Sequence, residues 1–412
     1  MKTKINRIFS VLLLTALLVA PLFVTTTASA WSSESKVKVM TQNLYLGADI
    51  FKVVEAAYIP DPDDPTGPPI PNPDPLAIPT AVAELFQTIQ YTNFPERAEA
   101  IANEIWVHRP QLIGLNEASI FYIQSPGDAA YGGKVPAEDV VYDYLDILLN
   151  ALSARGLNYK VAVEGYNADV EMPMVTGYVP ISVPPYFIPT FDDVRMVDRD
   201  VILVRGDVDS SNPISANYLT NLSQTIGGVT LEFTRGWVGA DVKVDGGIYR
   251  FVSTHLEVRS SVGSGFRAVQ AAQMQELLTI LSAEPKPIIL VGDFNSSPDD
   301  VPGTYDPDGA GPKPPIPYVP PYMLATDYFG YTDAWDRIFF PRDGFTDGFS
   351  ETLDNPSDKL SSRIDIVFLK PKKKSVNWVI GTVVGDNRFN MTPSGLWPSD
   401  HGGVVTWISF SK

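Results

Sequence analysis

Six short segments of this 412-residue chain set an acid, an amide or an imidazole directly beside an apolar run. Carboxylates hold hard divalent cations, an imidazole or a carboxylate can move a proton, and amides donate hydrogen bonds to a phosphate. Polar groups of these kinds at strand ends are the parts of a metal-assisted phosphoester hydrolase. The six segments are 41–43, 114–117, 253–256, 292–295, 362–365 and 399–401.

Two of these segments are the most informative. The apolar run Ile288–Val291 is predicted to be a strand that ends at Gly292 and delivers Asp293 and Asn295 at its carboxyl end. The triplet Ser399-Asp400-His401 precedes another apolar run. A single match of either kind occurs by chance, but six in order, each beside a predicted strand, indicate one site.

In this order the segments resemble the endonuclease/exonuclease/phosphatase superfamily, which includes pancreatic-type DNases, abasic-site endonucleases, bacterial sphingomyelinases and inositol polyphosphate phosphatases. The resemblance spans nearly all of the chain after residue 30, although only the motifs are close. It implies an α/β fold: a four-layer α/β sandwich of two mixed β-sheets packed face to face, with helices outside. It also implies a hydrolase that acts on ester bonds.

Three residues are candidates for a metal site. Glu117 is the leading candidate for a direct Mg²⁺ ligand, because hard carboxylate oxygen suits a hard cation. The resemblance places Asn43 beside it, either contributing an amide oxygen or holding a water on the metal. Asp400 would be a further carboxylate at or just behind the metal. Mn²⁺ or Ca²⁺ are alternative ions, and one metal or two stays open.

The resemblance also implies a set of catalytic residues. Asp293 would orient or deprotonate the attacking water, and Asn295 would donate to the developing phosphorane. His401 would contact the scissile phosphate, with Asp365 holding its imidazole in the right tautomer. His255 would be a phosphate contact or the acid toward the leaving group. Which histidine is acid and which is base stays open at this point.

Each candidate has a structural alternative. A glutamate after an apolar strand is commonly a solvated strand end, and a lone histidine is more often packed than catalytic. The chain has only three histidines, however, and two fall inside the motifs. The third, His108, is expected to end a helix and complement its dipole. A non-catalytic binding domain and a calcium-stabilised surface protein are the alternative functions.

The elements that must position these residues follow from periodicity. Three helices are predicted, at Phe94–His108, Asp139–Ala154 and Phe266–Ala283. No dinucleotide fingerprint or Walker loop occurs, which argues against a nucleotide cofactor. The predicted strands are Val37–Leu44, Gln111–Asn116, Tyr159–Val163, Val201–Val204, Val229–Phe233, Val238–Val244, Tyr249–Leu256, Ile288–Val291, Arg363–Leu369, Val376–Val384 and Val404–Phe410.

Four proline-rich stretches are predicted to be irregular loop insertions, at about 58–79, 124–136, 171–193 and 296–322. Three of them follow strands that end in Asn43, Glu117 and Asn295, so they should form the mouth of the site. The apolar stretch 177–189 is unlike a central strand because of its prolines. Such loops either touch an amphiphilic substrate or pack on the edge of the sandwich.

Residues 1–30 are predicted to be a cleaved signal peptide, because basic residues precede an apolar run that ends at Ala28-Ser29-Ala30. Residues 31–412 would then be a single secreted, extracellular catalytic domain. The absence of cysteine excludes disulfides and thiolate zinc sites.

The net charge of −17 weighs against general binding to polyanions, although a bound cation reverses the local sign in a cleft. The expected substrate is a phosphoester, with a phospholipid head group in a membrane, cleaved as by a sphingomyelinase, placed slightly ahead of nucleic acid. Inositol phosphates are a further alternative. No protein partner is evident, and a monomer is expected.

Overall fold

The computed structural model describes residues 34–64, 67, 69–180, 187–226, 229–259, 265–305, 316–339 and 343–411. The signal peptide predicted over residues 1–30 lies outside the described residues. Within these described ranges, no helix combines the length and apolar character needed to cross a membrane.

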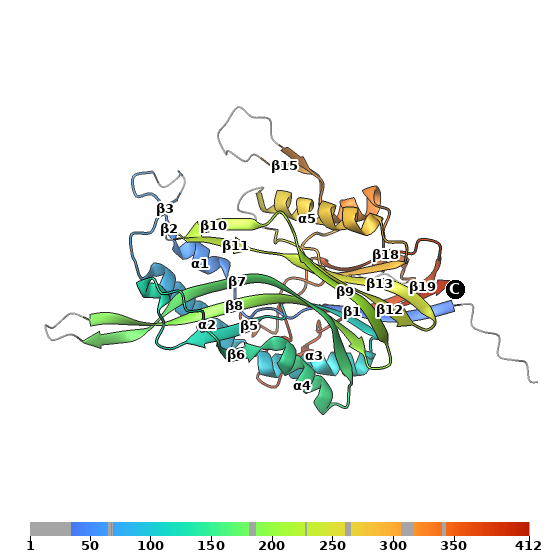
Figure 1. Cartoon of the computed structure of the whole chain (residues 1–412), viewed down its shortest axis with the longest axis horizontal. Helices are drawn as coiled ribbons and strands as arrows, with labels where there is room; N and C mark the ends of the chain where they lie inside the picture. Colours follow the sequence, from blue (N-terminus) through green and yellow to red (C-terminus); the bar gives the residue numbers. More distant parts are fainter. Residues whose placement is uncertain are drawn as a thin grey trace, which may run out of the picture. The chain divides into compact units, whose positions relative to one another are not determined.

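Two large mixed sheets form the middle of the domain (Figure 1). The first has the strand order β19-β20-β1-β4-β8-β5-β6, and β7 pairs with β8. Its strands are β1 (Glu34–Asn43), β4 (Leu112–Asn116), β5 (Ile120–Gln124), β6 (Asp139–Asp143), β7 (Tyr159–Pro180), β8 (Phe187–Arg205), β19 (Val376–Val384) and β20 (Gly403–Ser411).

The second sheet has the order β17-β18-β14-β13-β12-β9. Its strands are β9 (Asp209–Asn217), β12 (Gly236–Val244), β13 (Gly247–His255), β14 (Ile288–Asp293), β17 (Thr332–Asp333) and β18 (Asp365–Lys370). Three two-stranded ribbons complete the strands: β2 (Tyr58–Ile59) with β3 (Ile70–Pro71), β10 (Leu222–Ile226) with β11 (Val229–Phe233), and β15 (Gly303–Tyr305) with β16 (Ile316–Tyr318).

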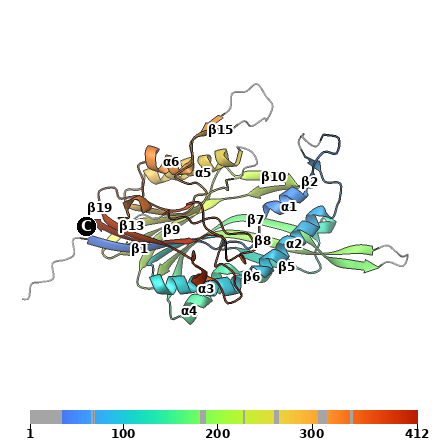
Figure 2. The ribbon, with the colours of Figure 1, turned by 180° about the vertical axis from the view of Figure 1, so that it is seen from behind.

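Helices cover the outer face of each sheet. The outer core of the first sheet includes side chains from α2 (Ala77–Tyr91), α3 (Phe94–His108) and α4 (Tyr144–Ala154). On the second sheet the outer core includes α5 (Gly265–Ser282), which Figure 2 shows on the side opposite α3 and α4. The remaining helices are α1 (Phe51–Ala56), α6 (Pro321–Met323), the 3₁₀ turns η1 (Ala129–Tyr131), η3 (Trp335–Arg337) and η4 (Arg388–Asn390), and the π turn η2 (Leu324–Tyr328).

A third core lies between the two sheets. Val39 of β1 and Ile202 of β8 belong to the same buried cluster as Phe251 of β13 and Val291 of β14. Burial of such apolar side chains on both sheets is the main force that holds them face to face. The predicted four-layer α/β sandwich is therefore confirmed.

The structure corrects three predictions about elements. The helix predicted over Asp139–Ala154 begins only at Tyr144, because residues 139–143 pair with β5 as strand β6. Asp143 then caps the helix by accepting hydrogen bonds from Leu145 N at 3.0 Å and Asp146 N at 3.2 Å. Helix α2 was not predicted, because Pro79 lies in a stretch that looked irregular; a proline in the first turn costs a helix no hydrogen bond.

The proline-rich stretch 171–193 is not an irregular loop. Its described part is the outer half of the β7–β8 hairpin, in which Glu171 pairs with Arg195 and Pro180 pairs with Phe187. Figure 1 shows this hairpin running out beyond the other strands. Pro173 and Pro180 are tolerated because an outward-facing edge needs no N–H donor. Residues 181–186 lie outside the described residues.

Candidate active site

The ends of four strands bring the predicted site residues together. Strands β1 and β4 are parallel, with Asn43 opposite Asn116, and Glu117 follows directly. Strands β13 and β14 are also parallel, with His255 opposite Asp293. Parallel strands expose their carboxyl ends at one edge, so each sheet contributes its polar residues to the same side.

Two antiparallel strands complete the set. Strand β18 begins at Asp365, which lies opposite Asp293 of β14. Strand β20 begins two residues after His401 and runs antiparallel to β1. The antiparallel direction therefore places the beginnings of β18 and β20 where the other strands end.

The backbone is constrained at this edge. Gly292 has φ of +142°, and a Cβ atom there would lie 1.9 Å from Thr254 O, so only glycine fits. Glu117 and Asn295 adopt positive φ values of 55° and 47°. Non-glycine residues pay a conformational cost in this region, and such positions cluster at functional sites.

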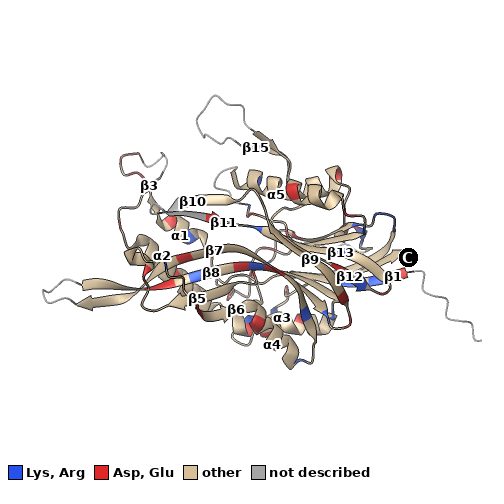
Figure 3. Cartoon of the chain, viewed as in Figure 1, with Lys and Arg blue, Asp and Glu red and all other residues tan. Residues whose placement is uncertain are grey.

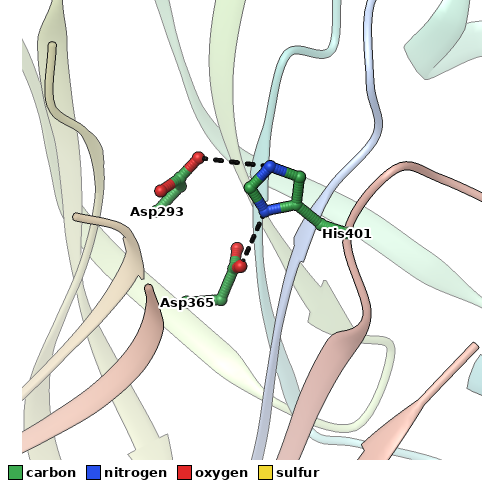
Figure 4. A group of neighbouring side chains, drawn as sticks. All are labelled: Asp293, Asp365 and His401. Atoms are coloured by element: carbon green, nitrogen blue, oxygen red, sulfur yellow. Dashed lines mark hydrogen bonds and ion pairs between the residues drawn. The ribbon is translucent and has the colours of Figure 1, made fainter. Parts of the chain in front are cut away.

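His401 lies between two carboxylates (Figure 4). Its Nδ1 donates to Asp365 Oδ2 at 2.7 Å, and its Nε2 lies 3.9 Å from Asp293 Oδ2 and 4.0 Å from Asp400 Oδ1. Burial alone would lower the pKa of His401, but the charges of Asp365, Asp400 and Asp293 hold the pKa well above its usual value. His401 is therefore positioned as an imidazolium whose Nε2–H faces the other acids.

His255 has the opposite kind of partner. Nη1 of Arg235 donates to His255 Nδ1 at 3.0 Å, because a guanidinium has no acceptor. Burial, Arg235 and His401 hold the pKa of His255 well below its usual value. A neutral imidazole that accepts at Nδ1 carries its proton on Nε2. That nitrogen lies 3.6 Å from Asp293 Oδ2 and 3.3 Å from Asn295 Nδ2, which donates to Leu256 O.

Asn43 links the two halves of the site. Its Nδ2 donates to Glu117 Oε1 at 2.9 Å and to Asp293 Oδ2 at 3.2 Å. Its Oδ1 accepts from Tyr45 N at 2.8 Å, so the amide oxygen points away from Glu117. The amide nitrogen of Asn43 therefore bridges the two carboxylates, while its oxygen is bonded to the backbone.

The acids at the site repel one another. Burial and the charge of Asp198 raise the pKa of Glu117, whose Oε2 also accepts from Leu46 N at 2.7 Å. Burial raises the pKa of Asp400 to about 7, with Glu117 adding to the effect. Burial and the charge of Asp365 raise the pKa of Asp293 to about 7. A cation between these groups would relieve the repulsion.

Two acidic groups could hold that cation. Donor atoms of Asp293, Asp365 and His401 lie within 4.8 Å of one another, but the 2.7 Å Asp365–His401 hydrogen bond already uses the two facing atoms. Glu117 and Asp400 both line the catalytic cavity described below. They are the better candidates for a hard cation, which takes carboxylate oxygens.

The catalytic cavity has a volume of about 300 Å³ and exposes the polar groups described above. Six of the eight residues predicted as functional line it, while Asn43 and Asp365 support the lining residues from behind. Apolar residues complete its wall, among them Ile50, Met196 and Phe233. The cavity is large enough for a phosphate group and part of its substituents.

Several polar residues that support the site were not predicted from the sequence. Asp198 and Asp200 lie buried on β8, where Asn167 Nδ2 donates to both, at 3.3 and 3.0 Å. Asn116 donates to Asp200 Oδ1 at 2.6 Å and accepts from Asp293 N at 3.1 Å. The sequence does contain a sign of these buried acids, because residues 198–200 are three charged residues inside an apolar run.

Arg97 supports the site from α3. Although fully buried, it donates to Leu44 O at 2.7 Å, Tyr45 O at 3.0 Å and Pro398 O at 3.0 Å. These bonds hold the loop after β1 against the loop that carries His401. Burying a guanidinium is costly, so this arrangement is stable only because its donors are satisfied.

Two further residues near the predicted motifs have structural partners. Arg363 forms an ion pair with Asp333, which leaves Asp365 to His401. His108 does end α3, but burial and the nearby Lys38 lower its pKa, so it does not carry the charge expected to complement the helix dipole.

The similarity to known proteins extends over nearly the whole domain. The endonuclease/exonuclease/phosphatase family matches residues 91–401, a range that includes five of the six segments. Among solved structures, truncated TDP2 from Caenorhabditis elegans is 14% identical, with a TM-score of 0.45, covering 90% of this chain and 97% of that chain. The sequence matches no curated protein.

Two further solved structures resemble this chain to a similar degree. The mannosyl-6-phosphatase Bt3783 from Bacteroides thetaiotaomicron is 14% identical, with a TM-score of 0.47, covering 90% of this chain and 99% of that chain. The human Nocturnin catalytic domain with bound sulfate is 16% identical, with a TM-score of 0.42, covering 91% and 94%.

Proposed function

Because the chain belongs to the endonuclease/exonuclease/phosphatase family, whose members hydrolyse phosphoester bonds, we propose that it cleaves a phosphodiester by in-line attack of water with the help of a divalent cation. The observation that carries this proposal is the position of Asp293 Oδ2, 3.6 Å from His255 Nε2 and 3.9 Å from His401 Nε2. One carboxylate that can take a proton thus lies between two imidazoles that can donate to a phosphate.

Each residue of the site has a separate role in this reaction. Asp293, with a pKa of about 7, orients the attacking water and accepts its proton. His401, held by Asp365, donates from Nε2 to a phosphate oxygen. His255 donates from its own Nε2, on the side of the leaving group. Asn295 holds the strand end beside His255, where its amide can turn to the developing phosphorane.

The donor set fits Mg²⁺, with Mn²⁺ or Ca²⁺ able to substitute. Glu117 and Asp400 would hold the ion, oriented by Asn43, and the ion would supply positive charge to the phosphate. Acids outnumber basic residues in the cavity wall, which contains Asp49, Glu117, Asp198, Asp293, Glu351 and Asp400 against Arg235 and the two histidines. That imbalance favours a bound cation.

Hydrolysis of bis-p-nitrophenyl phosphate tests this reaction. Turnover should require the divalent ion and should be lost in Asp293→Asn, with folding checked by circular dichroism. p-Nitrophenyl phosphate, assayed in parallel, separates a diesterase from a monoesterase. Full turnover after exhaustive chelation would contradict the proposal.

For the substrate, we place a phospholipid head group ahead of nucleic acid. Four large apolar residues described on the outer hairpin are at least half exposed: Tyr178 (57%), Val179 (50%), Phe187 (60%) and Ile188 (50%). Residues 172–180 and 187–191 carry no charge, and Figure 3 shows the charged residues of this hairpin only nearer its base. An uncharged apolar hairpin suits a lipid surface, whereas a net charge of −17 opposes a polyanion.

A substrate panel would rank these classes. Sphingomyelin liposomes, phosphatidylinositol phosphates, duplex DNA and RNA are compared with Mg²⁺ and with chelator. Tyr178→Ser combined with Phe187→Ser should reduce turnover on liposomes and not on bis-p-nitrophenyl phosphate. Rapid nicking of plasmid DNA without release of head groups would reverse the ranking in favour of a nuclease.

We also propose that the protein is secreted, on the strength of the pattern over residues 1–30. Expression of the full chain in a bacterial host should yield extracellular protein that begins at Trp31, as read by N-terminal sequencing. Intact Met1 on a protein retained in the cell would contradict this.

A further inference from the structure

An apolar hollow, here called the apolar groove, adjoins the catalytic cavity. Helix α1 contributes Val53 and Val54, α2 contributes Val82 and Leu85, and the hairpin contributes Val170 and Met172. Among the described residues, every side chain that lines the groove is apolar. Figure 1 places α1 and α2 beside the base of β7 and β8.

The apolar groove and the catalytic cavity share part of their walls. Ile50, Met196 and Phe233 line both. Met196 pairs across the hairpin with Val170, so one side of the ribbon carries apolar side chains from the cavity into the groove. The catalytic cavity and the apolar groove therefore meet at these three apolar side chains.

We infer that the apolar groove binds the part of a hydrocarbon chain nearest to the scissile phosphate, so that the substrate is an amphiphilic phosphoester; this inference rests on the proposed function. Nucleobases and sugars carry donors and acceptors that would stay unpaired against this wall, at a cost in binding free energy. Water is also held poorly, because a buried water needs two to four polar partners. Met172 and Met196 have flexible side chains that adapt to a chain passing between them.

The size of the groove limits how much chain it encloses. Its volume is about 60 Å³, against about 300 Å³ for the adjoining catalytic cavity. Only a short stretch of chain is enclosed, and the remainder extends outward. Each enclosed methylene should raise kcat/KM about fourfold, the equivalent of about 0.8 kcal/mol.

A series of 4-nitrophenyl alkyl phosphodiesters tests this inference directly. Methyl, butyl, hexyl and octyl esters share one leaving group, and all are used below their micelle concentrations with the full chain and Mg²⁺. We expect kcat/KM to rise from methyl to butyl and then to level off. A continued rise to octyl at the same slope would contradict enclosure in a groove of this size.

Substitution of Met172 locates the effect. Met172→Gln keeps the length of the side chain and adds a polar group, so the octyl-to-methyl ratio of kcat/KM should fall toward one. Met172→Leu should preserve the ratio. Val161→Gln is the matched control, because Val161 lies on the same strand β7 but outside both the groove and the outer hairpin and is 36% exposed; its ratio should equal that of the unsubstituted protein.

The outcomes separate the two proposals. If the methyl ester is hydrolysed but kcat/KM does not change with chain length, the groove inference is overturned and the proposed function stands. An unchanged ratio in Met172→Gln would also overturn it. If no ester is hydrolysed with Mg²⁺, both the proposed function and the inference fail.

Discussion

His401 and His255 both turn a ring nitrogen toward the same oxygen of Asp293, yet their surroundings are opposite in charge. Behind His401 stands Asp365, which accepts from Nδ1 at 2.7 Å. Behind His255 stands Arg235, which donates to Nδ1 at 3.0 Å. The first partner holds the pKa of its histidine well above the usual value, and the second holds it well below.

The difference shows that the fold assigns two roles to one residue type. Both rings turn Nε2 toward Asp293, but the His401 ring is positively charged and the His255 ring is neutral. The charged ring can stabilise a phosphate oxyanion, while the neutral ring can donate a hydrogen bond without adding charge to the site. The residue bonded to Nδ1 therefore decides whether the histidine is charged. For His255 this residue lies outside the six sequence segments.

His401→Ala should have the largest effect. Removing the charged donor should lower kcat about 10³–10⁴-fold, because groups of this kind act on charge that develops in the transition state. Thermal melting measured alongside turnover should change little. Near-normal kcat in this variant would show that the comparison assigns the charge to the wrong histidine.

Asp365→Asn should follow, with a loss of about 10²–10³-fold in kcat. The amide keeps the shape of the side chain but removes the negative charge behind His401 and can present the wrong group to Nδ1. Steady-state kinetics on bis-p-nitrophenyl phosphate measure this effect. If His401→Ala and the double variant with Asp365→Asn have equal kcat, Asp365 acts only through His401.

Glu117→Gln tests the acid that approaches His255, whose Nε2 lies 4.0 Å from Glu117 Oε1. The Mg²⁺ concentration for half-maximal activity should rise about 10–100-fold, because a neutral amide binds a hard cation more weakly. Glu351→Gln is a matched control, since Glu351 also lines the cavity but forms an ion pair with Lys52. Equal metal requirements in both variants would contradict the assignment of Glu117.

Arg235→Lys should have the smallest effect, a decrease of about tenfold in kcat with little change in KM. The charge stays, but the ammonium lacks the planar fork that places Nη1 on His255 Nδ1. Long-range ¹H–¹⁵N spectra of the imidazoles should show His255 with its proton on Nε2 in the parent protein and a mixture in the variant. An unchanged tautomer together with the same loss of kcat would indicate a different role for Arg235.

The sequence predicted the His401 side of this comparison better than the His255 side. Asp365, His401 and Asp293 all lie in short motifs at strand ends, where local pattern indicates both position and chemistry. Arg235 lies just before β12 and Asp198 within β8. Only the pairing of β12 with β13 brings Arg235 to His255, and only the path of β8 brings Asp198 to Arg235. Contacts of that kind depend on register, which single-strand patterns do not contain.

The same distinction holds for the fold. Strands with buried, apolar runs such as Ile288–Val291 were predicted, since their composition alone indicates burial. Strand β9 was missed because all nine of its residues are exposed, so no alternation marks it. The outer β7–β8 hairpin was missed because its prolines suggested a loop, whereas the ribbon is held by cross-strand pairing.

The pairing of β1 with β20 has a consequence for biosynthesis. Glu34 lies opposite Ser411, Asn43 is the last residue of β1, and His401 comes two residues before β20 begins. Asn43 is thus made early on the ribosome and His401 near the end, so we expect the site to assemble only after β20 has been made and has paired with β1. The adjacency of the two strands also means that a short linker could join residues 34 and 411, which makes the domain suited to circular permutation with new ends in an exposed loop.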